Sequence, residues 1–485
     1  MDFLHIHGGC ITDESGHPVR LRGTCVGGWM NMEDFINGYP GTESGIRAAL
    51  AHVMGEDMSA YFFDCMADNF FTEEDVRLIS ATGANCVRLA LSYRHFEEDR
   101  APLQYLERGF ARLDAALEWC ERHGVYVILD MHCVAGWQNS HWHCDNNRGA
   151  SVFWRHPHFQ ERLSALWQEF ARRYSKRAVV AAYGLMNEPS CGNPDGEHGF
   201  DFYRNYRSDW PLFNRVCHYL VSAIRQVDPD HIIMLEGDMY SRRFSGLDPD
   251  YGNHILLSNH HYIAPGFGPG EYPGYYSAGD TKVYWDRQYI CKNLMEQEGW
   301  VFAQENGLPL LVSEFGAQYH GPQNETGHRL QTMADQTDVY NQYGLHWTSW
   351  TYKDAGIMGW VTLNPQGEYS RRIAPVQKMK RVLGCENFVA LYEQSPGREK
   401  SRELADMILD VSGLTGIDPA ENGFTFNYAA LTGYAASTLQ RAYAQVFSDM
   451  TRADIRHMME DFSLGKCVRN ERFLQILRER LKQLP

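Results

Sequence analysis

The chain has 485 residues, 44% of them hydrophobic, so it can bury a large core in one or two domains. A formal net charge of −16 disfavours nucleic acid or an anionic membrane as the main partner. No apolar run approaches the roughly 18–20 residues that span a membrane, and the start lacks the basic and apolar regions of a secretory leader. We therefore expect a cytoplasmic protein that handles neutral ligands, if Met1 is the native start.

The first part of the chain predicts a β-hairpin followed by a strand. Residues 13–16 supply a turn, and residues 19–24 have the alternation of a strand. Such a hairpin would close the bottom of a barrel. Residues 35–71 then form a long insertion rich in aromatic residues and methionine, which we expect to be functional or partly helical.

Apolar strand-like runs then alternate with helical patterns. Leu106, Phe110, Leu113 and Leu117, for example, recur at helical spacing and predict one apolar face. Further strands are expected at residues 85–90, 125–129, 178–185, 231–235, 255–258, 310–312 and 345–350. About eight strands alternating with helices over residues 17–384 predict an α/β fold, the (β/α)₈ TIM barrel. A doubly wound open sheet is the alternative, but no Gly-x-Gly-x-x-Gly turn follows the first strand.

The character of the chain changes after Gly384, where several amphipathic helices are predicted and no strand runs occur. We therefore divide the chain into a barrel at residues 1–385, with long loops at 35–71 and 133–156, and a helical extension at 386–485. The plain interpretation is that the extension packs on the outer wall of the barrel. The alternatives are a homo-oligomer contact through these helices and a contribution to the rim of the active site.

Two glutamates end two of the predicted strands, far apart in the sequence. Pro189 keeps Glu188 away from helical backbone angles, so Glu188 lies where a strand gives way to a loop. Glu314 ends the apolar run 308–313. The carboxyl ends of barrel strands carry the active site. Glycoside hydrolysis needs two such acids, one to protonate the leaving oxygen and one to attack or to activate water. The segment Asn187-Glu188-Pro189 alone is equally typical of an ordinary turn.

Asn187-Glu188-Pro189 and Ser313-Glu314-Phe315-Gly316 resemble the acid/base and nucleophile motifs of glycoside hydrolase family 5, and the resemblance extends over about residues 3–385. It implies that Glu188 is the general acid/base and Glu314 the nucleophile of a retaining double displacement, with carboxyl groups roughly 5–5.5 Å apart. An acid must stay protonated near neutrality, so Glu188 is expected to have a raised pKa.

The same resemblance implies roles for other residues near the ends of strands. It implies that Asn187 forms a hydrogen bond with the sugar 2-hydroxyl and that Arg88 and Tyr262 hold Glu314 in position. It also implies that Trp350 forms the bottom of the subsite where the bond breaks, and that His132 and His260 line the same subsite. The segment Gly27-Gly28-Trp29, placed after the first strand, resembles one in the exo-acting glucanases of the family. In those enzymes a glutamate at the position of Glu33 contacts the terminal sugar.

A metal site is the competing interpretation of residues 132–145. Possible zinc ligands there are His132, Cys133, His141, His143, Cys144 and Asp145. Their spacing matches no standard zinc pattern, so we expect no metal and no cofactor. We interpret the segment as a polar rim loop in which Trp137 and Trp142 can stack on sugars. Glu236 and Asp238, after the fifth strand, are expected to line the pocket or to be structural.

These patterns together predict a retaining β-glycosidase whose partner is a carbohydrate substrate. Long loops around a barrel mouth turn an open cleft into a pocket, and a pocket admits only a chain end. We therefore expect exo action on short oligosaccharides or small glycosides. The alternatives are an endo-acting β-glucanase or mannanase and a sugar-binding barrel without catalysis, against which the two glutamates argue.

Overall fold

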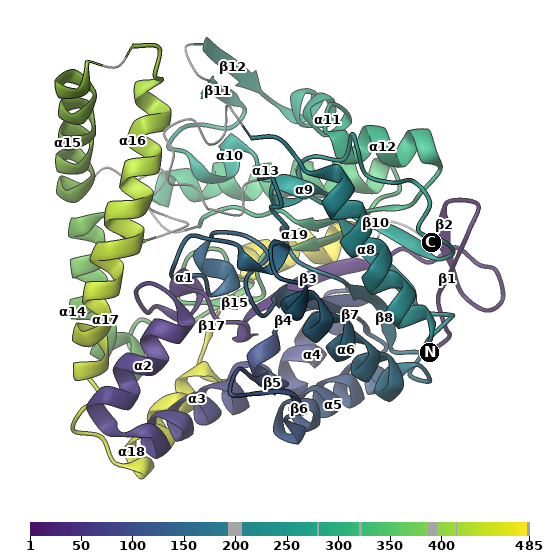
Figure 1. Ribbon diagram of the computed structural model, residues 1–485, viewed down its shortest axis with the longest axis horizontal. Coiled ribbons are helices and arrows are strands. Elements are labelled where there is room, and N and C mark those ends of the chain that lie inside the picture. The colour runs from purple at the N-terminus through teal and green to yellow at the C-terminus, as the bar shows by residue number, and fades with distance from the viewer. Residues whose placement is uncertain (193–205, 279–280, 320–322, 387–394, 414, 483–485) are drawn as a thin grey trace.

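The computed structural model describes the chain except for residues 193–205, 279–280, 320–322, 387–394, 414 and 483–485 (Figure 1). Its centre is a closed barrel of eight parallel strands in the order β10-β13-β14-β3-β4-β7-β8-β9. These strands are β3 (Arg22–Met30), β4 (Cys86–Ser92), β7 (Tyr126–Cys133), β8 (Val180–Gly184), β9 (Ile232–Glu236), β10 (Ile255–His260), β13 (Leu310–Glu314) and β14 (His346–Ser349). Pairing of β14 with β3 closes the ring, so the barrel prediction is confirmed and the open sheet is excluded.

Helices surround the barrel and bury the outer faces of its strands. They are α4 (Glu73–Ala81), α5 (Glu107–Arg122), α6 (Pro157–Tyr174), α8 (Trp210–Arg225), α11 (Arg287–Met295), α12 (Glu298–Asn306), α13 (Gln323–Gln342) and α14 (Glu368–Leu383). The apolar face predicted from Phe110, Leu113 and Leu117 is fully buried in α5. Because the strands are covered on both faces, they read as continuous apolar runs rather than as alternating ones.

The interior of the barrel changes from apolar to polar along the strands. Near their starts, Cys86, Ile128, Leu256 and Leu311 pack in one inner cluster. The next inward position lies two residues further on, because side chains alternate across a strand. At that level stand the buried polar residues Arg88, Asp130, Glu236, Ser258 and Ser313. The polar layer therefore forms the floor of a site at the carboxyl ends of the strands.

A hairpin closes the opposite end of the barrel, as predicted, but its turn is elsewhere. Strands β1 (His5–His7) and β2 (Cys10–Thr12) pair through Gly8 and Gly9, which both have positive φ, as a two-residue hairpin turn requires. Residues 13–16 form a second turn after β2. Leu4, Ile11 and Leu21 join the inner cluster.

The first barrel strand also differs from its prediction. It begins at Arg22 rather than at residue 19, and it continues through the Gly-Gly-Trp segment, which is therefore part of the strand rather than a loop after it. The register with β4 shifts between Val26 and Met30, so the strand bulges at these glycines.

The insertion at residues 35–71 is mostly helical. It contains α1 (Asp34–Asn37), α2 (Glu43–Met54) and α3 (Glu56–Phe70), whose Ile46, Leu50, Phe62, Met66 and Phe70 are buried. The segment 133–156 remains a loop, with short 3-10 turns at η2 (Trp142–Cys144) and η3 (Val152–Trp154). Smaller elements are η1 (Tyr93–His95), β5 (Glu97–Glu98), β6 (Ala101–Tyr105), α9 (Asp238–Ser241), α10 (Ala264–Phe267), β11 (Gly274–Ala278) and β12 (Thr281–Trp285).

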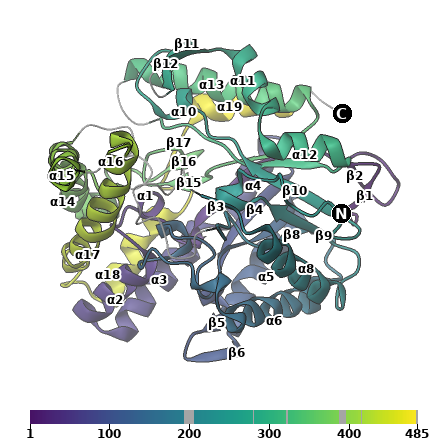
Figure 2. The same cartoon turned by 45° about the horizontal axis from the view of Figure 1, so that its top comes forward.

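The extension packs on the barrel but is not purely helical. It contains α15 (Pro396–Ser412), α16 (Pro419–Asn427), the π-helical segment η4 (Tyr428–Ala435), α17 (Ala436–Gln445), α18 (Arg452–Met459), η5 (Glu460–Phe462), β17 (Val468–Arg469) and α19 (Glu471–Leu481). Strand β17 pairs with β16 (Val361–Thr362), which pairs with β15 (Lys353–Asp354). In Figures 1 and 2, α15 and α16 stand at the end of the molecule opposite the hairpin. Within the described residues, no helix has both the length and the apolarity needed to cross a membrane.

Candidate active site

A cavity of about 340 Å³ lies at the carboxyl ends of the barrel strands. Of the residues predicted for the site, it is lined by Glu33, His132, Glu188, His260, Tyr262, Glu314 and Trp350. Arg88 and Asn187 are buried and do not line it, but both contact residues that do. The fold therefore brings together side chains from both ends of the barrel sequence.

The backbone around Glu188 is held in an uncommon conformation that aims its side chain into the cavity. Glu188 has a φ of 46°, in the left-handed region that glutamate rarely adopts. Its N–H donates to Glu236 Oε2 at 2.7 Å, and its carbonyl accepts from Asn139 Nδ2 at 2.8 Å. Buried Glu236 also accepts from Arg88 at 3.1 Å. Strain of this kind persists only where neighbours fix the backbone, as these contacts do.

The carboxylate of Glu188 lies between two imidazoles. His260 Nδ1 is 2.7 Å from Oε1, and His143 Nε2 is 3.2 Å from Oε2. Burial alone would raise the pKa of Glu188, but the positive charge of His260 and its hydrogen bond outweigh burial and lower that pKa. The expectation of a raised pKa is therefore wrong in this structure. It failed because the sequence does not reveal that His260 touches Glu188.

The proton of this pair resides on His260. Burial lowers the pKa of His260, but Glu314, Glu236 and Glu188 surround the ring with negative charge and raise that pKa well above its usual value. For His143, burial outweighs the negative charge of Glu188, and neighbouring histidines also disfavour its protonated form, so its pKa falls to about 3. Glu188 is thus an ionised carboxylate beside one charged and one neutral imidazole.

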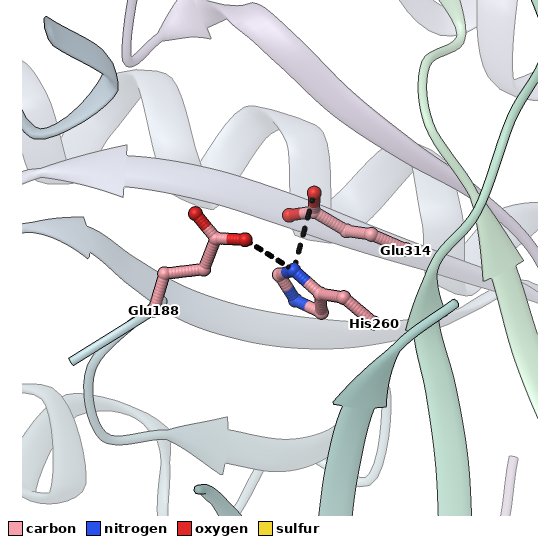
Figure 3. A group of neighbouring side chains, drawn as sticks. All are labelled: Glu188, His260 and Glu314. Carbon is pink, nitrogen blue, oxygen red and sulfur yellow. Dashed lines mark hydrogen bonds and ion pairs between the residues drawn. The ribbon is translucent and has the colours of Figure 1, made fainter. Parts of the chain in front are cut away.

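Glu314, at the end of β13, is held by two donors on one side of the cavity. Arg88 Nη1 donates to Oε1 at 2.6 Å, and the Tyr262 hydroxyl donates to Oε2 at 2.8 Å. Figure 3 shows His260 between the two glutamates, with Nδ1 3.6 Å from Glu314 Oε2. One ligand atom from each of Glu188, His260 and Glu314 lies within 4.8 Å of the others. Within the described residues, this is also the group that could hold a metal ion.

Arg88 links the glutamate to the polar floor. Its fully buried guanidinium also contacts Asp130 Oδ2 at 3.0 Å and donates to Asn187 Oδ1 at 2.6 Å. The amide nitrogen of Asn187 faces His132 Nε2 at 3.2 Å. A cation surrounded by carboxylates and an amide keeps its charge, and burial strengthens these contacts.

The far side of the cavity is formed by His132, Glu33 and Trp350. The rings of His132 and Trp350 are stacked, with centroids 5.2 Å apart. Burial raises the pKa of Glu33 to about 7, although His132 Nε2 lies 3.5 Å from its Oε1. Burial would lower the pKa of His132, but hydrogen bonds with Asp130 and Glu33 raise it to about 9.

Of the residues at 132–145 weighed as possible zinc ligands, the two cysteines and Asp145 have other partners. Cys133 Sγ donates to the carbonyl of Cys144, Cys144 Sγ contacts Asn139, and Asp145 forms an ion pair with Arg94. Trp142 lines the cavity, as a sugar platform would, whereas Trp137 packs against the core.

Several lining residues were not predicted from the sequence: Tyr240, Arg242, Phe267, Gln297 and Phe424. Tyr240 follows β9 closely, so its position at the end of a strand could have identified it. Phe424 lies in α16 of the extension, and no local pattern reveals that this helix reaches the barrel mouth. Glu236 and Asp238 do not line the cavity; they accept hydrogen bonds from the Glu188 backbone and from Tyr206.

Comparisons with known proteins show what the chain as a whole is similar to. Residues 52–356 match the model of the cellulase family, glycosyl hydrolase family 5. A β-xylosidase of Phanerodontia chrysosporium is 34% identical over 417 residues, covering 84% of this chain and 82% of the relative. Endoglucanase C of Acetivibrio thermocellus is 27% identical over 320 residues, covering 59% of this chain and 85% of the relative. A solved endogalactoceramidase shares the fold, with a TM-score of 0.50 and 17% identity over 73% of this chain and 75% of its own.

Proposed function

The chain belongs to glycoside hydrolase family 5, and from that membership we propose that it is a retaining β-glycosidase with exo action on short oligosaccharides or small glycosides. One observation carries the proposal: Glu188 and Glu314 face each other in one cavity with an oxygen of each within 4.8 Å of the other. Retaining enzymes hold their carboxyl groups roughly 5–5.5 Å apart, whereas inverting enzymes need roughly 6.5–9.5 Å.

In the first step, Glu314 attacks the anomeric carbon while Glu188 protonates the leaving oxygen. Arg88 and Tyr262 orient Glu314, because both donate hydrogen bonds to its oxygens. The bond from the anomeric carbon to the leaving oxygen breaks as the glycosyl–Glu314 ester forms. In the second step, Glu188 takes a proton from water, and the water oxygen displaces Glu314.

His260 supplies the proton that Glu188 needs as an acid. His260 Nδ1 lies 2.7 Å from Glu188 Oε1, so a proton can pass directly between them. The pKa of His260 is raised and that of Glu188 is lowered, so this transfer requires that substrate binding change the charges around the pair. When Glu314 becomes an ester, it loses its negative charge. A carboxyl group has a lower pKa when a neighbouring negative charge disappears, so Glu188 is then suited to act as a base.

Exo action is supported by the buried position of Glu33 in the lining of the cavity. Glu33 is only 3% exposed and lies beside His132 and Trp350, where its oxygens can accept hydrogen bonds from hydroxyls of a terminal sugar. The cavity volume of about 340 Å³ is near the lower end of the range for ligand pockets, roughly 300–1,000 Å³. β-Xylosides are the first candidate substrates, because the relative at 34% identity is named a β-xylosidase.

Endo action is the second candidate, because relatives at 27% identity are named endoglucanases. A panel of 4-nitrophenyl β-glycosides, followed by oligosaccharides labelled at the reducing end, separates the candidates. We expect release of one non-reducing-end unit at a time, with the β-anomer of the product first in NMR spectra. Early internal fragments would favour endo action, and initial α-anomer would exclude retention. Binding without hydrolysis of any substrate would leave a sugar-binding barrel.

A further inference from the structure

We propose that the C-terminal extension builds the leaving-group subsite and that this subsite takes an aromatic aglycone. This inference rests on the proposed function, because a leaving group exists only if Glu188 and Glu314 cleave a glycosidic bond. It adds a binding site formed by α15, α16 and η4, which lie outside residues 52–356, the part of the chain that matches the family model.

A second cavity, of about 470 Å³, lies between the loop 133–156 and the extension. It shares three lining residues with the active-site cavity, His141, Trp142 and Phe424, so the two spaces adjoin. The remainder of its lining comes from α15, α16 and η4, the helical elements that stand at the barrel end opposite the hairpin in Figure 1.

Ring contacts place this second cavity on the side of the acid rather than of the terminal sugar. His143 contacts the Glu188 carboxylate at 3.2 Å, and its ring centroid is 5.7 Å from that of His141. The ring of His141 lies between Tyr240, at 4.5 Å, and Tyr428 of η4, at 4.8 Å. The acid Glu188 protonates the leaving oxygen. The chain of ring contacts from His143 through His141 to Tyr428 therefore runs from the position of that oxygen to the extension. Glu33, His132 and Trp350 line only the active-site cavity.

The second cavity has charged residues on its α15 side, Arg398, Arg402 and Asp406, but its aromatic rings suit a flat aromatic body. Trp142, Phe424 and Tyr428 present rings to it, and aromatic ligands gain stacking contacts with such rings. Phe424 stands where the two cavities adjoin, so it would contact the first ring beyond the leaving oxygen. Gly423 leaves space beside it, since a Cβ at that position would meet no atom within 4 Å.

The test compares two glycosides of one sugar, the sugar that the wild-type enzyme hydrolyses fastest. The 4-methylumbelliferyl β-glycoside carries a bicyclic aromatic leaving group, and the β-glycosyl fluoride carries one that fills no subsite. We expect Phe424→Ala to lower kcat/KM about tenfold more for the umbelliferyl glycoside than for the fluoride, because one aromatic contact with the leaving group is lost. Phe424→Tyr keeps the ring and should retain most of the wild-type value.

Gly423→Leu tests the same subsite by filling it. Leucine is a better helix former than glycine, and a Cβ at position 423 would meet no atom within 4 Å, so the variant should fold. Its side chain would occupy the second cavity and should lower umbelliferyl activity more than fluoride activity. Tyr434→Ala is the matched control. Tyr434 lies in η4, which directly follows α16, but its side chain is 79% exposed and lines neither cavity. Equal loss on both substrates, or no loss on either, would overturn the subsite. Wild-type enzyme inert towards both would instead refute the glycosidase itself.

Discussion

At the scale of single residues, the two glutamates differ in the partners that surround them. Glu314 is held by Arg88 and Tyr262, two groups that keep their protons near neutrality. Glu188 is held by His260 and His143, which can gain or lose a proton in that range when their surroundings change. A nucleophile needs a fixed charge and an acid/base needs an exchangeable proton. The partners of Glu314 therefore suit a nucleophile, and the partners of Glu188 suit an acid/base.

The first prediction follows from this division. Glu314→Gln keeps the shape but removes the nucleophile, so kcat/KM should fall on the order of 10⁴–10⁶-fold with the circular dichroism spectrum unchanged. Glu188→Ala should retain more activity on substrates with good leaving groups, because these need little protonation. Added azide should then restore turnover and yield the β-glycosyl azide. An α-glycosyl azide would require that the two roles be exchanged.

The second prediction concerns the buried carboxyl group of Glu33. Its pKa is about 7 in the folded protein and near 4.5 when exposed, so the folded state binds this proton more tightly. The free energy of unfolding should therefore decrease as the pH rises from about 4.5 to 7, by about 3 kcal/mol from this group. Glu33→Gln removes that loss, so the variant should be more stable than wild type at pH 8 while losing activity.

Urea denaturation at pH 5 and pH 8 gives the change in the free energy of unfolding with pH for each protein. The effect of Glu33 is the difference between that change in wild type and that change in Glu33→Gln. Other groups that titrate in this range are present in both proteins and cancel to first order. Glu14→Gln, at an exposed turn position, is the control and should show no pH-dependent gain. Equal pH dependence in wild type and Glu33→Gln would mean that Glu33 titrates normally.

Some features of the site residues could be predicted from the sequence and others could not. Residues at strand ends, such as Glu188 and Glu314, could be found because strands and their ends are readable from local patterns. The pKa of Glu188 could not, because it depends on His260, which is 72 positions away in the chain. Phe424 was missed for the same reason, since only the packing of α16 brings it to the cavity.

At the scale of elements, β3 connects the fold to the site through Gly27 and Gly28. A Cβ at Gly27 would lie 2.6 Å from the Trp350 ring and 2.8 Å from Ile36. The absence of a side chain at Gly27 therefore leaves room for the indole of Trp350 beside the strand. The barrel strands and outer helices were predictable from apolar periodicity. The hairpin turn was placed at residues 13–16 although Gly8-Gly9 is itself a two-residue hairpin signal. Strand β17 was not predictable, because a two-residue strand leaves only a weak signal.

The third prediction is that Gly27→Ala disturbs the Trp350 side of the cavity. The added methyl group must displace the indole or Ile36, and overpacking of this kind costs about 1–3 kcal/mol. Because Trp350 lines the cavity, we expect a higher KM as well as a lower melting temperature. Gly465→Ala is the control, since its Cβ would meet no atom within 4 Å and Gly465 lies in the extension. An unchanged KM in Gly27→Ala would show that the indole does not contact substrate.

At the scale of the whole molecule, the barrel and the extension share one hydrophobic core. Phe447 and Phe462 of the extension belong to the same buried cluster as the barrel residues Val87 and Leu129. The ring of Phe447 lies 4.9 Å from Phe62 in α3. The sequence indicated amphipathic helices after Gly384, but it could not indicate which barrel elements they cover, because that pairing depends on contacts between distant segments.

The last prediction uses the buried side chain that joins the two parts. Lys353 Nζ donates to the carbonyls of Phe70 and Phe462, at 2.6 and 2.7 Å, and forms an ion pair with Asp75 at 2.8 Å. Lys353→Met removes the cation and leaves a buried carboxylate without its charged partner, which costs about 3–5 kcal/mol. Lys400→Met, which breaks an exposed pair with Glu403, should change stability by only about 0.5 kcal/mol.

Two optical probes show whether the barrel and the extension unfold together, so that the stability lost in Lys353→Met is lost by both. All twelve tryptophans precede residue 361, so their fluorescence reports the barrel, whereas far-ultraviolet circular dichroism also reports the helices of the extension. Because Lys353 contacts both parts, we expect both probes to show one coincident transition in wild type and one coincident, lowered transition in Lys353→Met. If the extension were a separate domain, the two signals would separate, and the variant would lower the midpoint of one while the other stayed at its wild-type value.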